Sequence, residues 1–468
     1  MKYFLAIIGG GPAGYTAAEK ASKAGKDVVL FEQNAVGGTC LNVGCIPTKS
    51  LLYGAKQYYN ATHAQKYGVT AENVTFDFGA MQKRKTIVVR KLIAGIKQRL
   101  NNEHCTVVNG AAKVMSPSSF SEAVHCPSSY CVECNGETYE AENLMICTGS
   151  TNFVPPIPGI KDNPAVWDST DALAATELPK SIIIVGGGVI GMEFATLYHE
   201  LGVPVTVIEA MPTILPNLDP EVVQILLDKY RKAGINILTS TKVESIDGNE
   251  LTANGQQLTA DKILVSVGRR ANLQGLEALN DLELNRGAIV IDEFCRTNLP
   301  NVYACGDVTG KIMLAHVASR QAEVAVAKML NDQMLNDPYG EADRSTGGRL
   351  EMVNYNAIPS VVYTNPEIAS VGITEAQAES MSIPVEVRKL PMTFSGRFMA
   401  ENEGETGLCK MIIDANNHSV LGVHMIGNPC SEFISAASFA VSNRYTTEEM
   451  QQVVFPHPTV SEILHEIL

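Results

Sequence analysis

The chain has 468 residues, of which 45% are hydrophobic and 18% are charged, and its formal net charge is −14 at pH 7. This composition excludes a disordered chain, and the excess of acidic residues argues against nucleic-acid binding, which needs concentrated Lys and Arg. The length predicts about three or four domains. No segment approaches the ~20 apolar residues of a membrane span, so we expect a cytoplasmic protein whose cysteines are mostly reduced.

The N-terminal segment predicts a unit of strand, glycine turn, helix and strand that binds a dinucleotide. The apolar run 3–8 leads into GGGPAG, in which Gly9, Gly11 and Gly14 satisfy the pattern G-x-G-x-x-G. A helix-forming segment follows, and then a strand that ends at Glu32. Glycine lets the backbone approach a pyrophosphate at the helix N-terminus, and the Glu32 carboxylate can accept hydrogen bonds from ribose hydroxyls.

Two cysteines, Cys40 and Cys45, follow in the stretch GGTCLNVGCIPTKS. They could be buried apolar residues, metal ligands or a redox-active pair. On a regular helix this spacing turns the second side chain about 140° from the first, so a disulfide requires an irregular backbone, which Gly44 permits. A helix that starts here would lower the pKa of a nearby thiol. The spacing favours a redox pair over zinc, because no other ligands lie nearby in the sequence.

A hairpin is expected near residues 107–140, where Asn135-Gly136 favours a tight turn. Four residues around it could be interpreted as a metal cluster: His125, Cys126, Cys131 and Cys134. Strand residues three positions apart point to opposite faces. We therefore expect no metal site.

The nucleotide-binding pattern returns later, with Gly186, Gly188 and Gly191 at the turn and a strand expected to end at Glu209. Two such units predict two dinucleotides, one of which could be a flavin. The acid at Glu209 repels an additional ribose phosphate, and no arginine follows closely, so NAD is favoured over NADP. Glu193, in the first helical turn, is either a nucleotide contact or an acid favoured by the helix dipole.

Near the C-terminus, His457 lies between two prolines and Glu462 follows five residues later. A carboxylate bound to one ring nitrogen would fix the tautomer and leave the other nitrogen to accept a proton. The histidine is either a solvated surface residue or part of a catalytic site.

The stretch GGTCLNVGCIPTKS resembles the redox-active segment of the flavin-dependent pyridine nucleotide–disulfide oxidoreductases. The resemblance continues through both nucleotide units, TGS at 148–150, VYACGD at 302–307, MLAH at 313–316, PSVVYTNPEIASVG at 359–372 and HPTVSE at 457–462. Within this family the motifs are similar to those of the dihydrolipoamide dehydrogenases. The resemblance implies oxidation of protein-bound dihydrolipoyl groups through a Cys40–Cys45 disulfide and FAD, with hydride transfer to NAD⁺.

The resemblance also implies the roles of individual residues. The implied catalytic residues are Cys40, Cys45, His457, Glu462, Lys49 and Glu193. The implied FAD contacts are Gly9, Gly11, Gly14, Glu32, Gly38, Thr39, Lys49, Gly110, Thr148, Gly149, Asp307, Met313, Leu314, Ala315 and His316. The implied NAD contacts are Gly186, Gly188, Gly191, Glu193, Glu209, Val243 and Gly268.

The fold class implied is α/β, with two Rossmann-like nucleotide-binding domains, for FAD and NAD, and a C-terminal α+β dimerisation domain. The expected parts are an FAD-binding domain at 1–150, an NAD-binding domain at 151–270, a central segment at 271–345 that completes the FAD site, and an interface domain at 346–468. The polar stretch at 341–349 would be a linker. A homodimer follows, in which His457 reaches the cysteines of the neighbouring subunit, so that the two active sites are shared.

The expected partners are lipoyl-bearing proteins of 2-oxoacid dehydrogenase or glycine-cleavage complexes. Other members of the family fit less well: glutathione reductase would carry arginines after the second nucleotide strand, and mercuric reductase and the large thioredoxin reductases carry a further C-terminal thiol pair. Residues 317–320, 394–397 and 455–456 depart from the usual pattern. A reductase of another disulfide therefore stays an alternative, as does a non-catalytic FAD-binding protein.

Overall fold

The computed structural model describes residues 2–115, 129–336 and 352–468. Its internal contacts divide the chain into two units. Unit 1 comprises Met1–Pro47, Lys83–Phe153 and Arg269–Val353, and unit 2 comprises Thr48–Gln82, Val154–Gly268 and Asn354–Leu468. The four-part division expected from the sequence stays a prediction, and the expected linker at 341–349 lies outside the described residues.

Unit 1 is built on a seven-stranded sheet that begins with the first nucleotide unit. β1 (Lys2–Ile8) lies between β2 (Val28–Glu32) and β6 (Glu137–Ile146), both parallel to it. The other strands of this sheet are β3 (Cys105–Asn109), β4 (Lys113–Val114), β5 (Tyr130–Cys134) and β19 (Val302–Ala304). Every residue of β2 is buried, as expected for a parallel strand that is covered on both faces.

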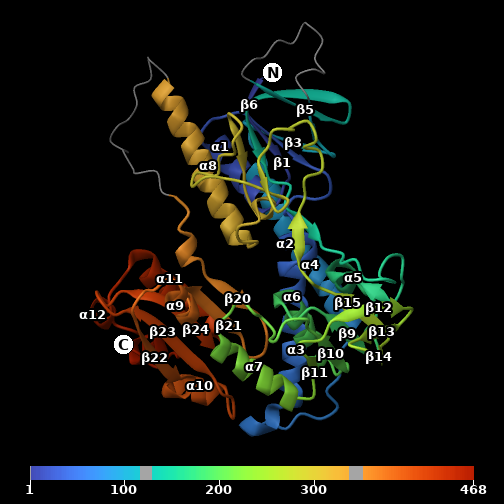
Figure 1. Ribbon diagram of the computed structural model, residues 1–468, viewed down its shortest axis with the longest axis vertical. Helices are drawn as coiled ribbons and strands as arrows, with labels where there is room; N and C mark the ends of the chain where they lie inside the picture. The colour runs from blue at the N-terminus through green and yellow to red at the C-terminus, as the bar shows by residue number, and fades with distance from the viewer. Residues whose placement is uncertain (1, 116–128, 337–351) are drawn as a thin grey trace. The chain divides into compact units, whose positions relative to one another are not determined.

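Helices cover this sheet, and α1 (Pro12–Lys23) lies along α8 (Ala315–Asn336) in Figure 1. The buried face of α1 consists of alanine, glycine and serine, and such small side chains allow close approach of its backbone. α2 (Gly38–Val43) belongs to unit 1, whereas α3 (Cys45–Thr62) and α4 (Phe78–Leu100) continue from one unit into the other. Short elements complete the unit: β7 (Ser150–Asn152) with β16 (Arg269–Ala271), β17 (Leu284–Asn285) with β18 (Ala288–Ile289), and the 3₁₀ helix η3 (Asp307–Thr309).

The expected hairpin is present between β5 and β6. Its turn residues Asn135 and Gly136 have φ of 56° and 81°, the combination that a tight type I′ turn requires. Cys131 and Cys134 are buried in this hairpin. His125 and Cys126, the other members of the cluster considered above, lie outside the described residues.

Unit 2 contains the second nucleotide unit, in a five-stranded parallel sheet. Its strands are β8 (Val166–Trp167), β9 (Ile182–Val185), β10 (Val205–Ile208), β11 (Asn236–Leu238) and β15 (Lys262–Val265). Its helices are α5 (Ser169–Ala174), α6 (Val189–Glu200) and α7 (Pro220–Lys232). An antiparallel sheet consists of β12 (Val243–Asp247), β13 (Glu250–Ala253) and β14 (Gln256–Thr259). The prediction that β10 ends at Glu209 was wrong by one residue, because the chain turns there and the Glu209 carboxylate binds nearby backbone N–H groups.

The C-terminal part of unit 2 is an antiparallel sheet in the order β20-β21-β24-β23-β22. Its strands are β20 (Ser360–Val362), β21 (Ile368–Gly372), β22 (Val385–Pro391), β23 (Leu408–Asp414) and β24 (Val420–Ile426). Its helices are α9 (Glu375–Ser380), α10 (Gly396–Glu401), α11 (Cys430–Asn443), α12 (Thr447–Gln451) and α13 (Ile463–Glu466). The expected fold class, two Rossmann-like units with a C-terminal α+β part, is confirmed. Within the described residues, no helix has both the length and the apolar character needed to cross a membrane.

An ion cluster around a buried lysine joins the nucleotide-binding part of unit 2 to its C-terminal sheet. Lys410, on β23, is 1% exposed, and its Nζ lies 2.9 Å from Oδ2 of Asp219, 2.8 Å from Oε1 of Glu221 and 2.7 Å from Oε2 of Glu375. Burial alone would lower the pKa of Lys410, but its hydrogen bonds to the three carboxylates raise that pKa above its ordinary value. Because Asp219 is the N-cap of α7, the cluster fixes the start of this helix against β23.

Candidate active site

The two nucleotide units share the same backbone geometry at their glycine turns. Gly9 and Gly186 have φ of 104° and 110°, which side-chain-bearing residues rarely adopt. A Cβ on Gly14 would lie 1.8 Å from the carbonyl oxygen of Gly9, and a Cβ on Gly191 would lie 2.0 Å from that of Gly186. Each helix can therefore start close to its strand only because these positions are glycine.

The N-termini of α1 and α6 suit the pyrophosphate of a dinucleotide. Their N-cap residues, Gly11 and Gly188, are extended, and no described side chain caps either helix by a hydrogen bond. The backbone N–H groups of the first turn therefore remain for an anion. Gly38 faces the first of these turns, since a Cβ on it would lie 2.6 Å from Cα of Gly11. The residues present thus fit two dinucleotides.

The two acids at the strand ends are fixed by backbone N–H groups in the same way. Glu32 accepts hydrogen bonds from the backbone N–H groups of Gly10 and Asn34, both at 2.8 Å. Glu209 accepts them from the backbone N–H groups of Gly187 and Met211, both at 2.7 Å. Each carboxylate is held beside its glycine turn, and its remaining lone pairs can accept ribose hydroxyls.

The backbone between the two N-terminal cysteines is irregular, as the sequence requires for a redox pair. α2 ends at Val43, α3 begins at Cys45, and Gly44 between them has φ of −147° and ψ of −112°. A Cβ on Gly44 would lie 3.3 Å from Cα of Cys40. The chain therefore folds back toward Cys40 just before the second cysteine, which lies at the start of a helix, where a thiolate is stabilised.

Several other cysteines are in surroundings that keep their thiols protonated. Burial raises the pKa of Cys105 to about 11 and that of Cys409 to about 12, and it also raises the pKa of Cys147 and Cys305. These cysteines are poor nucleophiles because the thiolate is the reactive form. Cys40 and Cys45, like Cys105, are half-buried, whereas Cys147, Cys305 and Cys409 are buried.

The ion pair expected between Lys49 and Glu193 is present in unit 2. Nζ of Lys49, on α3, lies 2.9 and 2.7 Å from the two carboxylate oxygens of Glu193, on α6. The Glu193 side chain is only 5% exposed, and its Oε1 also accepts a hydrogen bond from the backbone N–H of Tyr363 at 3.1 Å. The Tyr363 ring lies 4.7 Å from Nζ of Lys49. Since both Glu193 oxygens bind groups of the protein, a nucleotide contact at Glu193 stays a prediction.

Asp307 is held by residues that sequence analysis missed. The hydroxyl of Ser150 donates a hydrogen bond to Oδ2 of Asp307 at 2.5 Å, and it accepts one from Nε of Arg269 at 2.7 Å. Arg269 also binds the side chain of Asn152. Ser150 is the last residue of the TGS motif, which was the available signal in the sequence.

The other residues assigned to the cofactors lie in varied surroundings. Thr148 donates a hydrogen bond to the backbone carbonyl of Asn272 at 2.6 Å. Gly149 and Gly268 have open space where a Cβ would lie, whereas the side chain of Val243 is buried, so only its backbone could contact a nucleotide. Three assigned groups lie at element ends: Thr39 in α2, Gly110 after β3, and Met313, Leu314, Ala315 and His316 at the start of α8.

A basic cavity of about 590 Å³ opens in unit 1 beside one of these residues, Met313. Its walls carry four cationic side chains: Arg269, Arg270, Arg286 and Lys311. Among the described residues, no acidic side chain lines it. Guanidinium and ammonium groups attract phosphate, so the positive charge of the cavity suits the region next to a nucleotide site in an otherwise acidic chain.

The histidine and glutamate near the C-terminus are in contact as the sequence predicted. Nδ1 of His457 lies 2.8 Å from Oε2 of Glu462. The histidine side chain is 80% exposed, whereas that of the glutamate is 11% exposed. The contact uses Nδ1 and does not involve Nε2, the ring nitrogen at which an imidazole can still accept a proton. Across the described part of the chain, no group of three or more His, Cys, Asp or Glu side chains is arranged to hold a metal ion.

Comparison with known proteins accounts for both parts of the chain. Residues 3–322 match the family model of the pyridine nucleotide-disulphide oxidoreductases, and residues 358–468 match the dimerisation domain of that family. The chain belongs to the pyridine nucleotide-disulphide oxidoreductases. FAD and NAD are the cofactors of this family, in agreement with the two nucleotide units, and its dimerisation domain supports a homodimer.

Curated relatives and solved structures cover nearly the whole chain. The chain is similar to the dihydrolipoyl dehydrogenase of Chlamydia muridarum (36% identical, covering 98% of this chain and 95% of the relative) and to that of Bacillus subtilis (37% identical, covering 99% and 97%). It is also similar to the structure of the HOCl-induced flavoprotein disulfide reductase RclA from Escherichia coli (TM-score 0.82, 30% identical, covering 99% of both chains). LpdA from Mycobacterium tuberculosis has the same fold (TM-score 0.86, 24% identical, covering 99% and 98%).

Proposed function

We propose that the protein is a dihydrolipoyl dehydrogenase, which oxidises protein-bound dihydrolipoyl groups and reduces NAD⁺. The observation that carries this proposal is the similarity, over nearly the full length of both chains, to curated dihydrolipoyl dehydrogenases at 35–37% identity. The partners that we propose are lipoyl-bearing proteins of 2-oxoacid dehydrogenase or glycine-cleavage complexes, and the location is the cytoplasm.

Cys40 and Cys45 carry out the thiol chemistry in this proposal. A substrate thiolate attacks Sγ of Cys40, the Cys40–Cys45 bond breaks, and Cys45 leaves as a thiolate. The second substrate thiolate then displaces Cys40 and closes the substrate disulfide. The substrate loses two electrons and the cysteine pair gains them. The position of Cys45 at the start of α3 supports this assignment, because a helix N-terminus stabilises the leaving thiolate.

His457 acts as the base that accepts the substrate proton. Glu462 orients the ring through Nδ1, and Nε2 takes the proton from the attacking thiol. In the homodimer, His457 of the partner subunit serves each cysteine pair. The high exposure of this histidine in a single chain supports this arrangement, as does the dimerisation domain that contains it.

The cofactors would be held by the two glycine turns and by the residues around them. Gly9, Gly11, Gly14 and Glu32 would hold the adenosine end of FAD, and the corresponding residues of the second unit, Gly186, Gly188, Gly191 and Glu209, would hold NAD. Bound FAD supplies the two-electron carrier between the thiols and NAD⁺. Lys49, fixed by Glu193, would place one positive charge beside the flavin, and Asp307, fixed by Ser150, would accept hydroxyl groups of the same cofactor.

Steady-state rates with paired substrates test the proposal. The purified, flavin-loaded protein should reduce lipoamide with NADH faster than with NADPH, and faster than it reduces glutathione disulfide or mercuric ion. Cys45→Ser should abolish lipoamide turnover, whereas the control Cys105→Ser should leave it unchanged, because burial keeps the Cys105 thiol protonated. Full lipoamide turnover by Cys45→Ser would contradict the role of the cysteine pair.

A reductase of another substrate is the second candidate, favoured by the similarity to RclA. The departures at residues 317–320, 394–397 and 455–456 would then reflect a different substrate. Poor lipoamide turnover together with rapid NADH-dependent reduction of Cu(II), the ion in two of the RclA structures, would favour this candidate. A protein that binds FAD but turns over none of these substrates would instead be a non-catalytic flavin-binding protein.

A further inference from the structure

One face of α6 carries three buried polar side chains: Glu193, Thr196 and Glu200. Their spacings of three and four residues place them on the same side of the helix. A buried polar group is costly unless it is hydrogen-bonded. The partners of these three side chains therefore show what this face of α6 binds.

The outer two of these side chains bind one segment, residues 363–367, which connects β20 to β21. Glu193 accepts the backbone N–H of Tyr363 at 3.1 Å, and Glu200 accepts the side-chain N–H of Asn365 at 2.7 Å. The middle side chain, Thr196, contacts the hydroxyl of Tyr230 at 2.5 Å, and Tyr230 in turn accepts the backbone N–H of Asn365 at 3.2 Å. All three contacts of α6 thus lead to the same short segment.

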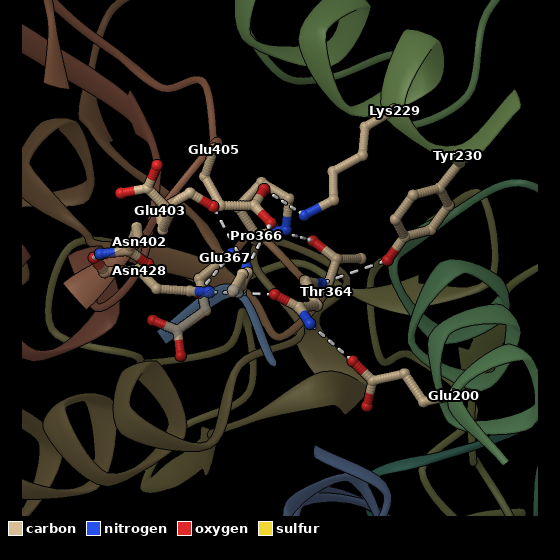
Figure 2. A network of polar contacts seen from close by, with 12 residues as sticks. Glu200, Lys229, Tyr230, Thr364, Pro366, Glu367, Asn402, Glu403, Glu405 and Asn428 are labelled. Atoms are coloured by element: carbon tan, nitrogen blue, oxygen red, sulfur yellow. Dashed lines mark hydrogen bonds and ion pairs between the residues drawn. The ribbon is translucent and has the colours of Figure 1, made fainter. Parts of the chain in front are cut away.

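Asn365 is the residue that fixes this segment. Three of its polar groups are bound, each by a different part of unit 2: the backbone N–H by Tyr230 of α7, the side-chain NH₂ by Glu200 of α6, and the side-chain oxygen by Asn428, which follows β24 and donates to it at 3.0 Å. Figure 2 shows Glu200 and Tyr230 turned from their helices toward the segment that carries Thr364 and Pro366.

The segment in turn contacts the ion pair of the candidate active site. Tyr363, two residues before Asn365, donates its N–H to the same Glu193 oxygen that lies 2.9 Å from Nζ of Lys49. Its ring lies 4.7 Å from that Nζ. A shift of the segment would therefore remove one hydrogen bond from the Glu193 carboxylate and one aromatic face from Lys49.

We propose that Asn365 is a positioning residue for the Lys49–Glu193 pair, anchored by Glu200 and Tyr230. It fixes residues 363–365 between α6 and α7, so that the Tyr363 N–H stays on Glu193 and the Glu193 carboxylate stays on Lys49. The consequence for turnover rests on the proposed function, in which Lys49 serves the flavin, but the effect on the ion pair does not.

The chemical accessibility of the Lys49 amine tests the proposal directly. The full-length protein, with and without FAD, is treated with formaldehyde and cyanoborohydride, and the initial methylation rate of Lys49 is measured by mass spectrometry relative to that of Lys23, an exposed lysine of unit 1. Asn365→Ala should raise the relative rate about tenfold, the factor expected when a hydrogen bond to a charged group is lost. Asn443→Ala is the matched control, because Asn443 binds only the end of α11 among the described residues, and it should leave the rate unchanged.

A second pair of variants keeps the test decisive if Asn365→Ala does not fold. Glu200→Gln retains an oxygen that can accept the Asn365 N–H, so Lys49 should be methylated at the wild-type rate. Glu200→Ala removes the acceptor and should raise the rate as Asn365→Ala does. In turnover, Asn365→Ala should lower kcat and leave the KM for NADH unchanged, since the glycine turn of the second unit is not altered.

The outcomes separate this inference from the proposed function. Wild-type methylation of Lys49 in both Asn365→Ala and Glu200→Ala would overturn the positioning role, whatever the activity. Faster methylation in a protein whose wild type does not turn over lipoamide would support the positioning role and contradict the proposed function.

Discussion

The contact between His457 and Glu462 shows what short spacing in a sequence can and cannot predict. A spacing of five residues between the two side chains was enough to predict the hydrogen bond, and the structure has it at 2.8 Å. Their spacing could not predict that the imidazole would be exposed while the carboxylate is nearly buried, because exposure depends on how the rest of the chain packs. An exposed base held by a buried acid can accept a proton from a group outside its own chain.

His457→Gln tests this role at the scale of one residue. The variant should bind flavin normally but slow thiol exchange with dihydrolipoamide by ~10²–10⁴, the usual contribution of a general base. Stopped-flow absorbance of the flavin measures that rate. His418→Gln is a matched control, because His418 is also exposed and lies 2.7 Å from a carboxylate, that of Glu448. Equal losses in the two variants would show that the effect is not specific to the base.

Residues whose partners lie far away in the sequence could not be identified from the sequence. Ser150 and Arg269 bind each other across 119 positions, and Asn365 binds Glu200 across 165. Neither pair has a spacing that marks it as a pair, and serine, arginine and asparagine are common surface residues. By contrast, the ion pair between Lys49 and Glu193 could be predicted, but only from the resemblance to a known family.

At the scale of elements, the two nucleotide units were predictable because their requirements are local. The pattern of three glycines fixes where each strand stops and each helix begins, and both turns have the expected backbone. The break at Gly44 between α2 and α3 was predicted as the condition for a disulfide between Cys40 and Cys45, because a regular helix would turn their side chains apart. The predicted end of β10 was wrong by one residue. An acid at Glu209 is expected at the end of this strand whether or not its own backbone is hydrogen-bonded to the neighbouring strand, so the residue type does not show where the strand stops.

The buried face of α6 predicts a pH dependence of stability. Burial raises the pKa of Glu200 to about 7 from its ordinary 4.5, although Asn365 and the amino groups of Lys56 and Lys229 oppose the shift; the hydroxyls of Tyr59 and Tyr230 also face this carboxyl. The folded state therefore holds a proton more tightly than the unfolded state. The stability that Glu200 contributes is complete below pH 4.5 and is lost as pH rises through 7.

Glu200→Gln should remove this pH dependence. The wild type should lose about 3 kcal/mol of unfolding free energy from this group between pH 4.5 and 8, by the conversion of 1.36 kcal/mol per pKa unit, and the variant should not. Urea unfolding at several pH values measures the difference. Glu403→Gln, which changes an exposed acid of the same region (Figure 2), is the control and should keep the wild-type profile. An unchanged profile in Glu200→Gln would contradict the assignment.

At the scale of the whole molecule, the order of motifs along the chain predicted the fold class but not the contacts. Each of the two units is assembled from three separate stretches of sequence, and α3 leaves the unit that contains the cysteines before it reaches Lys49. No local pattern states which stretches return to which unit. Long-range packing decides this. A single sequence indicates such packing only through its apolar residues, and these occur in every stretch of the chain.

Mixed dimers test whether the active sites are shared between subunits. Cys45→Ser and His457→Gln should each be nearly inactive alone. If each site takes its cysteines from one subunit and its histidine from the other, the heterodimer has one intact site. Random exchange of equal amounts should then restore roughly a quarter of wild-type activity, since half of the dimers are mixed and half of their sites are intact. No recovery after exchange, verified by native mass spectrometry, would mean that each chain builds its own site.

The ion cluster at Lys410 limits how this chain can be recombined. Its ammonium lies on the C-terminal sheet, whereas Asp219 and Glu221 belong to the start of α7 in the nucleotide-binding part. A chimaera that took its last hundred or so residues from a relative without a matching lysine would leave Asp219 charged in a dry interior. In the reverse exchange Lys410 would keep Glu375, which belongs to its own part, but would lose Asp219 and Glu221. Removing one partner of a buried pair costs ~3–5 kcal/mol. We therefore expect that the nucleotide-binding part of unit 2 and its C-terminal sheet can be transferred to another chain successfully only together.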